Sequence, residues 1–185
     1  MTASDRVKDD LSYIAGIVRR EDRDNGLPVI NFMWSVLVGV GFALPDFAPR
    51  WVGWYWLIVG PIGGLASWWL GARQGQKAGV NDIELGRRYA YHWLLAAFAF
   101  VVVFLPALTG KVSPAAAATN VLLVGGLTHA LAGVHLERHL LWSGLLLLGG
   151  YVALSVLQLP YVWTATGLIV AASLALAGVT QLKRT

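Results

Sequence analysis

Three histidines and a glutamate interrupt an otherwise apolar stretch, GGLTHALAGVHLERHLLW, at residues 125–142. Imidazole and carboxylate groups can bind a metal ion, ligate haem, move a proton or hydrogen-bond neighbouring helices. If the stretch is helical, His129 and His135 are six residues apart and point about 120° away from each other. One helix therefore cannot present both imidazoles to the same ion.

A second set of side chains is expected to meet near the end of this helix. His92 begins another apolar segment at a depth similar to that of His135, and Glu137 and His139 follow in the adjacent turn. These four groups could converge on zinc or another divalent ion. The sequence HLERH, however, matches no established ligand spacing, and histidines are common at helix ends. We therefore expect solvated or capping roles for these residues, and no bound metal or other cofactor.

His129 is the ionisable residue expected deepest in the membrane. It lies four residues from both Gly125 and Gly133, on a face of small residues that suits close packing against another helix. We expect a neutral imidazole that hydrogen-bonds to Asn31 or Ser35 on a facing segment. The alternative is a functional role in which His129 lines a path for a proton or a solute.

Other patterns that carry chemistry are missing from the sequence. The absence of cysteine excludes disulfides and thiolate metal sites. Acidic residues fall in the N-terminal segment, in the 72–89 loop and in turns, so we expect no buried carboxylate of the kind that ion-coupled transporters use. No catalytic motif or phosphate-binding loop is found, and no feature indicates nucleic-acid binding. These absences argue against an enzyme.

The elements that position these residues are apolar helices. Of the 185 residues, 57% are hydrophobic and 13% are charged, which is typical of a chain in a bilayer. Lipid offers the backbone no hydrogen-bond partners, so apolar segments near the ~20 residues needed to cross the hydrocarbon must be helical. We predict an all-α polytopic membrane protein, a six-transmembrane-helix bundle of three helical hairpins. Its spans are 28–45, 51–71, 90–108, 117–136, 140–158 and 161–180.

The distribution of lysine and arginine predicts the orientation. Of the 14 basic residues, all but Arg50 and Lys111 fall in the N-terminal segment, the 72–89 loop, the 137–139 turn and the C-terminal tail. Such an excess marks the cytoplasmic side. We therefore predict a protein of the cytoplasmic (inner or plasma) membrane with both termini in the cytoplasm. Residues 1–26 contain no apolar core of a cleavable signal peptide.

Residues 1–26 form a separate segment ahead of the membrane domain, which covers 27–185. Val7, Leu11, Ile14 and Val18 share one face of an amphipathic helix predicted over residues 4–22. Basic and acidic groups nearly cancel in this segment, so it is poorly suited to an anionic lipid surface. We expect it to pack on the cytoplasmic end of the bundle or on a partner protein. The alternative is a helix lying at the membrane interface.

Small residues recur along the spans and predict close helix packing. They include Gly60 and Gly64 in the second span, Gly125 and Gly133 in the fourth, and Gly167 in the sixth. Glycines at helical spacing let two backbones approach within the membrane. The same faces could bind a partner protein or a second copy of the chain.

Three functional interpretations follow from these features. We favour a structural, accessory or regulatory membrane component, because packing features are plentiful and catalytic ones are missing. The first alternative is a small transporter or channel with a path near His129. The second is a membrane protein that holds haem or a metal through histidines.

Overall fold

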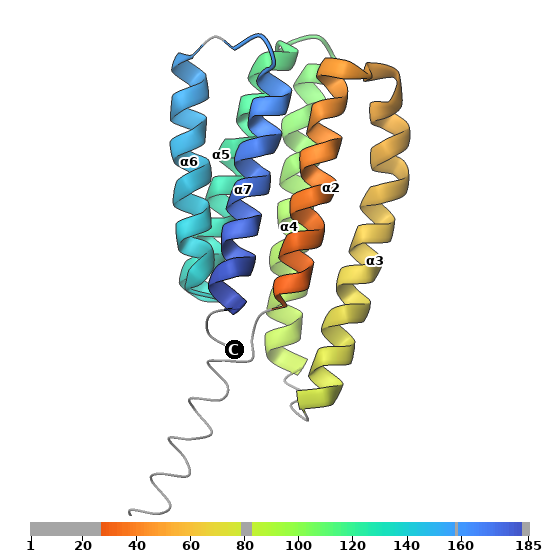
Figure 1. Cartoon of the computed structure of the whole chain (residues 1–185), viewed down its shortest axis with the longest axis vertical. Helices are drawn as coiled ribbons and strands as arrows, with labels where there is room; N and C mark the ends of the chain where they lie inside the picture. Colours follow the sequence, from red (N-terminus) through yellow and green to blue (C-terminus); the bar gives the residue numbers. More distant parts are fainter. Residues whose placement is uncertain (1–26, 79–82, 158, 183–185) are drawn as a thin grey trace, which may run out of the picture.

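A computed structural model describes residues 27–78, 83–157 and 159–182, and every regular element in these ranges is helical. Six long helices run side by side, alternately up and down (Figure 1). The amphipathic helix predicted over residues 4–22 lies outside the described residues. The elements are α2 (Pro28–Phe47), η1 (Pro49–Trp51), α3 (Val52–Ala78), α4 (Ile83–Leu108), α5 (Pro114–His135), α6 (His139–Val156) and α7 (Val162–Leu182).

Helix boundaries follow from local sequence chemistry. Between α4 and α5, Gly110 adopts a φ of 70°, a conformation that favours glycine. The Ser113 hydroxyl then accepts a hydrogen bond from the backbone N–H of Ala116 at 3.2 Å. Pro114 follows in the first turn, where its missing N–H is not needed. This serine–proline pair therefore fixes the start of α5.

The helices have the length and surface of a membrane bundle. Five of them, α2 and α4–α7, are long and apolar enough to cross a membrane. The remaining long helix, α3, has 27 residues, but its many Gly and Trp residues lower its mean hydropathy. Outward-facing side chains on α4 such as Leu94 and Phe98 are apolar and about two-thirds exposed. Such a surface is unfavourable in water and suits lipid.

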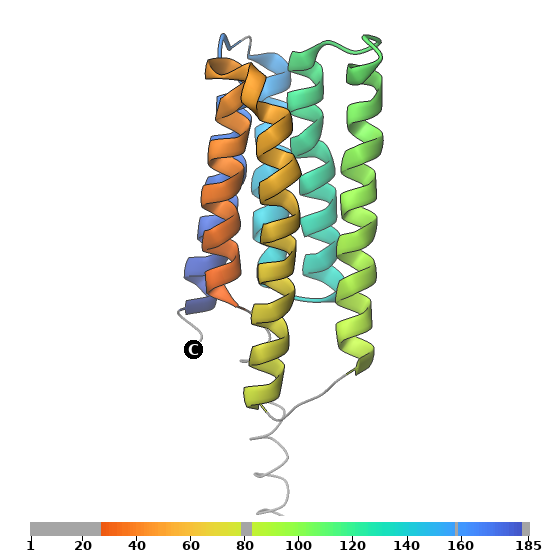
Figure 2. The same cartoon turned by 90° about the vertical axis from the view of Figure 1, so that its right-hand side faces the viewer.

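The helices do not pair as three hairpins in series. The two closest pairs are α2 with α7 and α5 with α6, so the first described helix lies against the last. Among the long helices, α3 packs on α2, and α4 lies closest to α5. Each of these two helices stands at the margin of the bundle in one of the two views (Figures 1 and 2). The core is therefore α2, α5, α6 and α7, with α3 and α4 outside it.

Polar and close-packed contacts hold α2 against α7. Near the end of α2, Asp46 Oδ2 accepts hydrogen bonds from the backbone N–H and the hydroxyl of Thr164, at 2.7 and 2.6 Å. Farther along, a Cβ added at Gly167 would lie 2.5 Å from the Cβ of Phe42. Asp46 thus caps the N-terminal end of α7 with a side chain from another helix. Position 167 requires glycine because the Cβ of Phe42 is fixed to the α2 backbone and leaves no room for a side chain.

Glycines set the distance between α5 and α6 in the same way. A Cβ added at Gly133 would overlap the backbone of Leu141, and one at Gly126 would lie 2.7 Å from Leu148. Gly125 is also buried, but its nearest neighbour, Leu147, is at an ordinary 3.6 Å. Backbone contact of this kind is what small residues contribute to helix packing in lipid.

Gly60 and Gly64 pack against nothing among the residues that the structure describes. A Cβ added at either position would meet nothing within 4 Å in the described structure. Gly63 packs against α2 instead, where an added Cβ would lie 3.0 Å from the Trp34 ring. Ser67 accepts a hydrogen bond from Trp34 Nε1 at 2.9 Å, one turn along the same face. Among the described residues, therefore, Gly63 and Ser67 face α2, and Gly60 and Gly64 do not.

Candidate functional site

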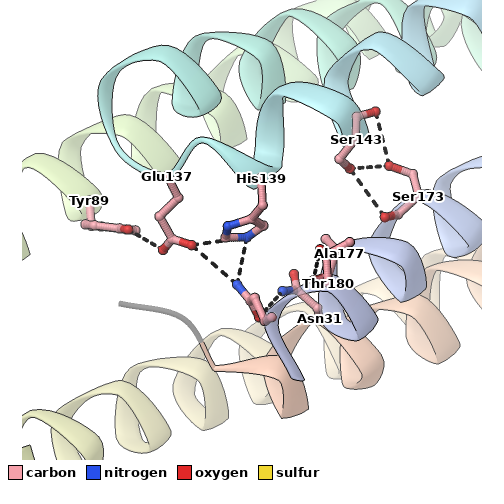
Figure 3. A network of polar contacts seen from close by, with 9 residues as sticks. Asn31, Tyr89, Glu137, His139, Ser143, Ser173, Ala177 and Thr180 are labelled. Atoms are coloured by element: carbon pink, nitrogen blue, oxygen red, sulfur yellow. Dashed lines mark hydrogen bonds and ion pairs between the residues drawn. The ribbon is translucent and has the colours of Figure 1, made fainter. Parts of the chain in front are cut away.

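A network of polar side chains lies at the end of the bundle where α2 begins and α7 ends. Five residues form one network there, and they come from four helices and from the turn between α5 and α6 (Figure 3). They are Asn31 on α2, Tyr89 on α4, Glu137 in the α5–α6 turn, His139 at the start of α6 and Gln181 on α7.

Gln181 is the centre of the network. Asn31 Nδ2 donates to Gln181 Oε1 at 2.9 Å, which joins the first and last described helices. On its other side, Gln181 Nε2 donates to Glu137 Oε2 at 3.3 Å and lies 2.7 Å from His139 Nε2. The Gln181 residue is only 8% exposed. Its amide can donate and accept at the same time, which suits it to bridging an amide and an acid.

Glu137 is held by side chains on both of its oxygens. Its Oε1 accepts a hydrogen bond from the Tyr89 hydroxyl, and its Oε2 lies 3.1 Å from His139 Nε2. The Glu137 side chain is 10% exposed, and burial raises the pKa of its carboxyl group. Hydrogen bonds from Tyr89 and Gln181 partly offset this rise. An acid with these surroundings can retain a proton under conditions where an exposed glutamate would lose it.

The tight turn between α5 and α6 directs Glu137 inward. The backbone N–H groups of Leu136 and Glu137 both donate to the carbonyl of Ala132, at 2.8 and 2.9 Å. Leu140 then donates to the Glu137 carbonyl at 2.9 Å as α6 begins. Because the chain reverses direction within three residues, the Glu137 side chain points across the end of the bundle toward Tyr89 and Gln181.

The four candidate ligands do not converge as one set. Glu137 and His139 meet, but His92 Nε2 lies 3.1 Å from the carbonyl oxygen of Thr128, and His135 is exposed. Within the described ranges, no three His, Asp or Glu side chains are grouped closely enough to hold a metal ion. The expectation of solvated roles for Glu137 and His139 was wrong, as was the expectation that no carboxylate is buried.

His129 is buried as its small-residue face indicates, but its partner differs from the prediction. Its Nδ1 lies 2.9 Å from the carbonyl oxygen of Gly125, one turn back on its own helix. Its ring meets that of Trp93 edge-on, with centroids 5.4 Å apart. Asn31 and Ser35 cannot reach it because both face α7, where the Ser35 hydroxyl donates to the Ala171 carbonyl at 2.7 Å.

The sequence did not lead us to predict two sets of buried polar side chains, the Ser143–Ser173 pair and Gln181. Ser143 on α6 and Ser173 on α7 are almost fully buried, and their hydroxyls hydrogen-bond to each other between the helices. Gln181 was missed because it falls at the end of the last span, where a polar side chain is ordinarily solvated. Its position three residues after Gly178, on a face that packs, was the available signal.

In the described residues, the fold is an all-helical bundle with apolar outer faces and a network of five polar residues at one end. Searches of protein-family models, curated proteins and solved structures found nothing similar to this chain. Its function must therefore be argued from the described residues.

Proposed function

We propose that the chain crosses the cytoplasmic membrane six times, with α3 as the sixth span and both termini in the cytoplasm. The even number of long helices brings Pro28 and Leu182 to the same end of the bundle (Figure 1). That end also carries most of the described basic residues, as positive charge on the cytoplasmic side requires. They include Arg73, Arg87, Arg88 and Arg138, against Arg50 and Lys111 at the other end.

Within the membrane, we propose a structural, accessory or regulatory role. One observation carries this proposal: most of the buried polar side chains among the described residues join helices to one another, namely His139, Ser143, Ser173 and Gln181. Gln181 links α2, α6 and the α5–α6 turn, and Ser143 and Ser173 link α6 to α7. In the described part of the chain, only the Thr166 hydroxyl is buried with no hydrogen-bond partner. A transporter or enzyme would be expected to keep several polar groups for its substrate.

The outer helix α3 supports the accessory part of this proposal. It packs on α2 through one face, and its other face leaves Gly60 and Gly64 open. Open glycines four residues apart allow the backbone of another membrane helix to approach. We propose that a second copy or a partner protein packs there, or on the N-terminal segment.

Native mass spectrometry of the protein from mild detergent tests the accessory role. We expect a homo-oligomer or a complex with another membrane protein, and we expect Gly64→Leu to dissociate it. Gly149→Leu is the matched control, because Gly149 is another glycine with nothing within 4 Å of its added Cβ. A monomer that carries a stoichiometric cofactor would contradict the proposal.

A small proton-coupled transporter is the second candidate, and the burial of Glu137 favours it. A carboxylic acid next to Tyr89 and His139 resembles the groups through which protons move in such proteins. This candidate requires a proton flux that depends on Glu137, whereas a structural role requires none.

A further inference from the structure

Asn120 on α5 is a polar side chain of a long apolar helix that makes no hydrogen bond among the described residues. It lies six residues after Pro114, about 9 Å into a helix that is long and apolar enough to cross the membrane. Hydroxyls on the same helix are satisfied one turn back, because Thr119 and Thr128 donate to the carbonyls of Ala116 and Val124 at 3.0 and 2.9 Å. An amide that faces hydrocarbon without such a partner is costly.

Asn120 belongs to a stripe of side chains along the outer side of α5. The members of the stripe follow one another at intervals of four and three residues, which keeps them on one face of a helix. They are Asn120, Val124, Leu127, Leu131 and Val134. Leu127 and Leu131 are 49% and 53% exposed, and Val134 is 67% exposed. The buried residues of α5, such as Gly125 and His129, lie on the other side of the helix, where α4, α6 and α7 pack.

The spacing of this α5 stripe is typical of two helices that pack side by side at a small crossing angle. Left-handed pairs of membrane helices use such a seam, as soluble coiled coils do. A single asparagine in an otherwise apolar seam sets the register and the number of helices, because its amide pairs with another polar group. Asn120 holds that position in the stripe. The pattern therefore indicates a neighbouring helix that brings a polar group to the depth of Asn120.

We propose that the α5 stripe is the contact between two copies of this chain, and that the Asn120 amides of the two copies hydrogen-bond to each other. Copies inserted into one membrane share one orientation, so a two-fold axis along the membrane normal sets the two α5 helices parallel. Residues of equal number then meet at equal depth. An amide both donates and accepts, so two Asn120 side chains satisfy each other. The contact lies on a different helix from the open glycines of α3 and does not depend on what packs there.

Disulfide cross-linking in native membranes tests this contact. The chain has no cysteine, so each introduced cysteine is the only one. Leu127→Cys and Leu131→Cys each place a thiol in the α5 stripe. Leu145→Cys on α6 is the matched control, because Leu145 is 48% exposed, against 49% for Leu127. Its depth is also similar, since the neighbouring Gly144 packs directly against Ala130 of α5.

On oxidation, we expect Leu127→Cys and Leu131→Cys to form a covalent species with the mass of two chains, and Leu145→Cys to remain monomeric. Adding Asn120→Leu to Leu127→Cys should weaken association about threefold to thirtyfold, which is the effect of interhelical hydrogen bonds in membranes. The cross-linked fraction at several protein-to-lipid ratios measures this change. Adding Gly64→Leu instead should leave the cross-link unchanged, because Gly64 is on α3.

The proposal would be overturned by stripe cysteines that do not cross-link, or by a control that cross-links as strongly as they do. A product with a mass other than that of two chains would show a different occupant and would also overturn it. Association that Asn120→Leu leaves unchanged would contradict the amide pair. Loss of the cross-link in the Gly64→Leu variant would place the contact on α3 instead, so the two surfaces are tested separately.

Discussion

Replacement of Gly133 by alanine should loosen the contact between α5 and α6. The added Cβ would overlap the backbone nitrogen and Cα of Leu141, and backbone atoms cannot move aside as the tip of a side chain can. The two helices must therefore separate locally. Overpacking of this kind costs about 1–3 kcal/mol, against a gain of at most about 1 kcal/mol when alanine replaces glycine in a helix. We expect a net loss of about 1–2 kcal/mol.

Gly149→Ala on α6 provides the comparison, because it makes the same chemical change where the added Cβ meets nothing within 4 Å. It keeps the helix-propensity gain without the overlap, so its stability should equal or slightly exceed that of the wild type. Thermal unfolding of both variants in the same mild detergent, followed by tryptophan fluorescence, measures the difference. Equal midpoints for Gly133→Ala and Gly149→Ala would refute the assignment of the α5–α6 contact.

Three further changes test individual contacts. Because burial raises the pKa of Glu137 above its ordinary 4.5, the folded protein binds more protons than the unfolded chain above that pH. Stability should therefore fall as pH rises from 4.5 through the raised pKa, and thermal melts of Glu137→Gln should lack this slope. Asp46→Ala should lower the stability by about 1 kcal/mol because the first turn of α7 loses its cap. Backbone amides near Thr164 should then exchange hydrogen faster than those in the rest of α7. His129→Leu should cost about 1 kcal/mol in thermal melts, mainly from the lost edge contact with Trp93, and a loss beyond 3 kcal/mol would contradict this local role.

The presence of the helices was the predictable part of the fold, but two of their ends were not, because α3 continues to Ala78 and α4 begins at Ile83, inside the segment 72–89 that was predicted to be a loop. Apolar length and the prolines and glycines between segments indicate each long helix, as at Ser113 and Pro114 before α5. These signals depend only on residues close together in the sequence, so they can be recognised without knowing which helices pack against each other. The α3 glycines show where local reasoning stops. Gly63 and Gly64 differ by one residue, or about 100° around the helix, and only the position of α2 decides which one packs.

The pairing of helices was not predictable for the same reason. Nothing local to Asn31 indicates Gln181, which is 150 residues away and becomes its partner only when α2 meets α7. The burial of Glu137 likewise depends on Tyr89 from another helix, so its place in a turn suggested solvent. The individual polar residues could be identified from the sequence, but their partners required the three-dimensional arrangement.

Proton flux and thermal stability, measured together on reconstituted protein, test the central proposal that the buried polar groups join helices rather than conduct. Wild type and Glu137→Gln would be compared in proteoliposomes under a pH gradient, with Glu84→Gln as the control. We predict that all three proteins show the proton flux of empty liposomes. We also predict that only Glu137→Gln changes the pH dependence of stability. A wild-type flux above the empty-liposome level that Glu137→Gln abolishes with the fold intact would contradict the structural role and establish the transporter instead.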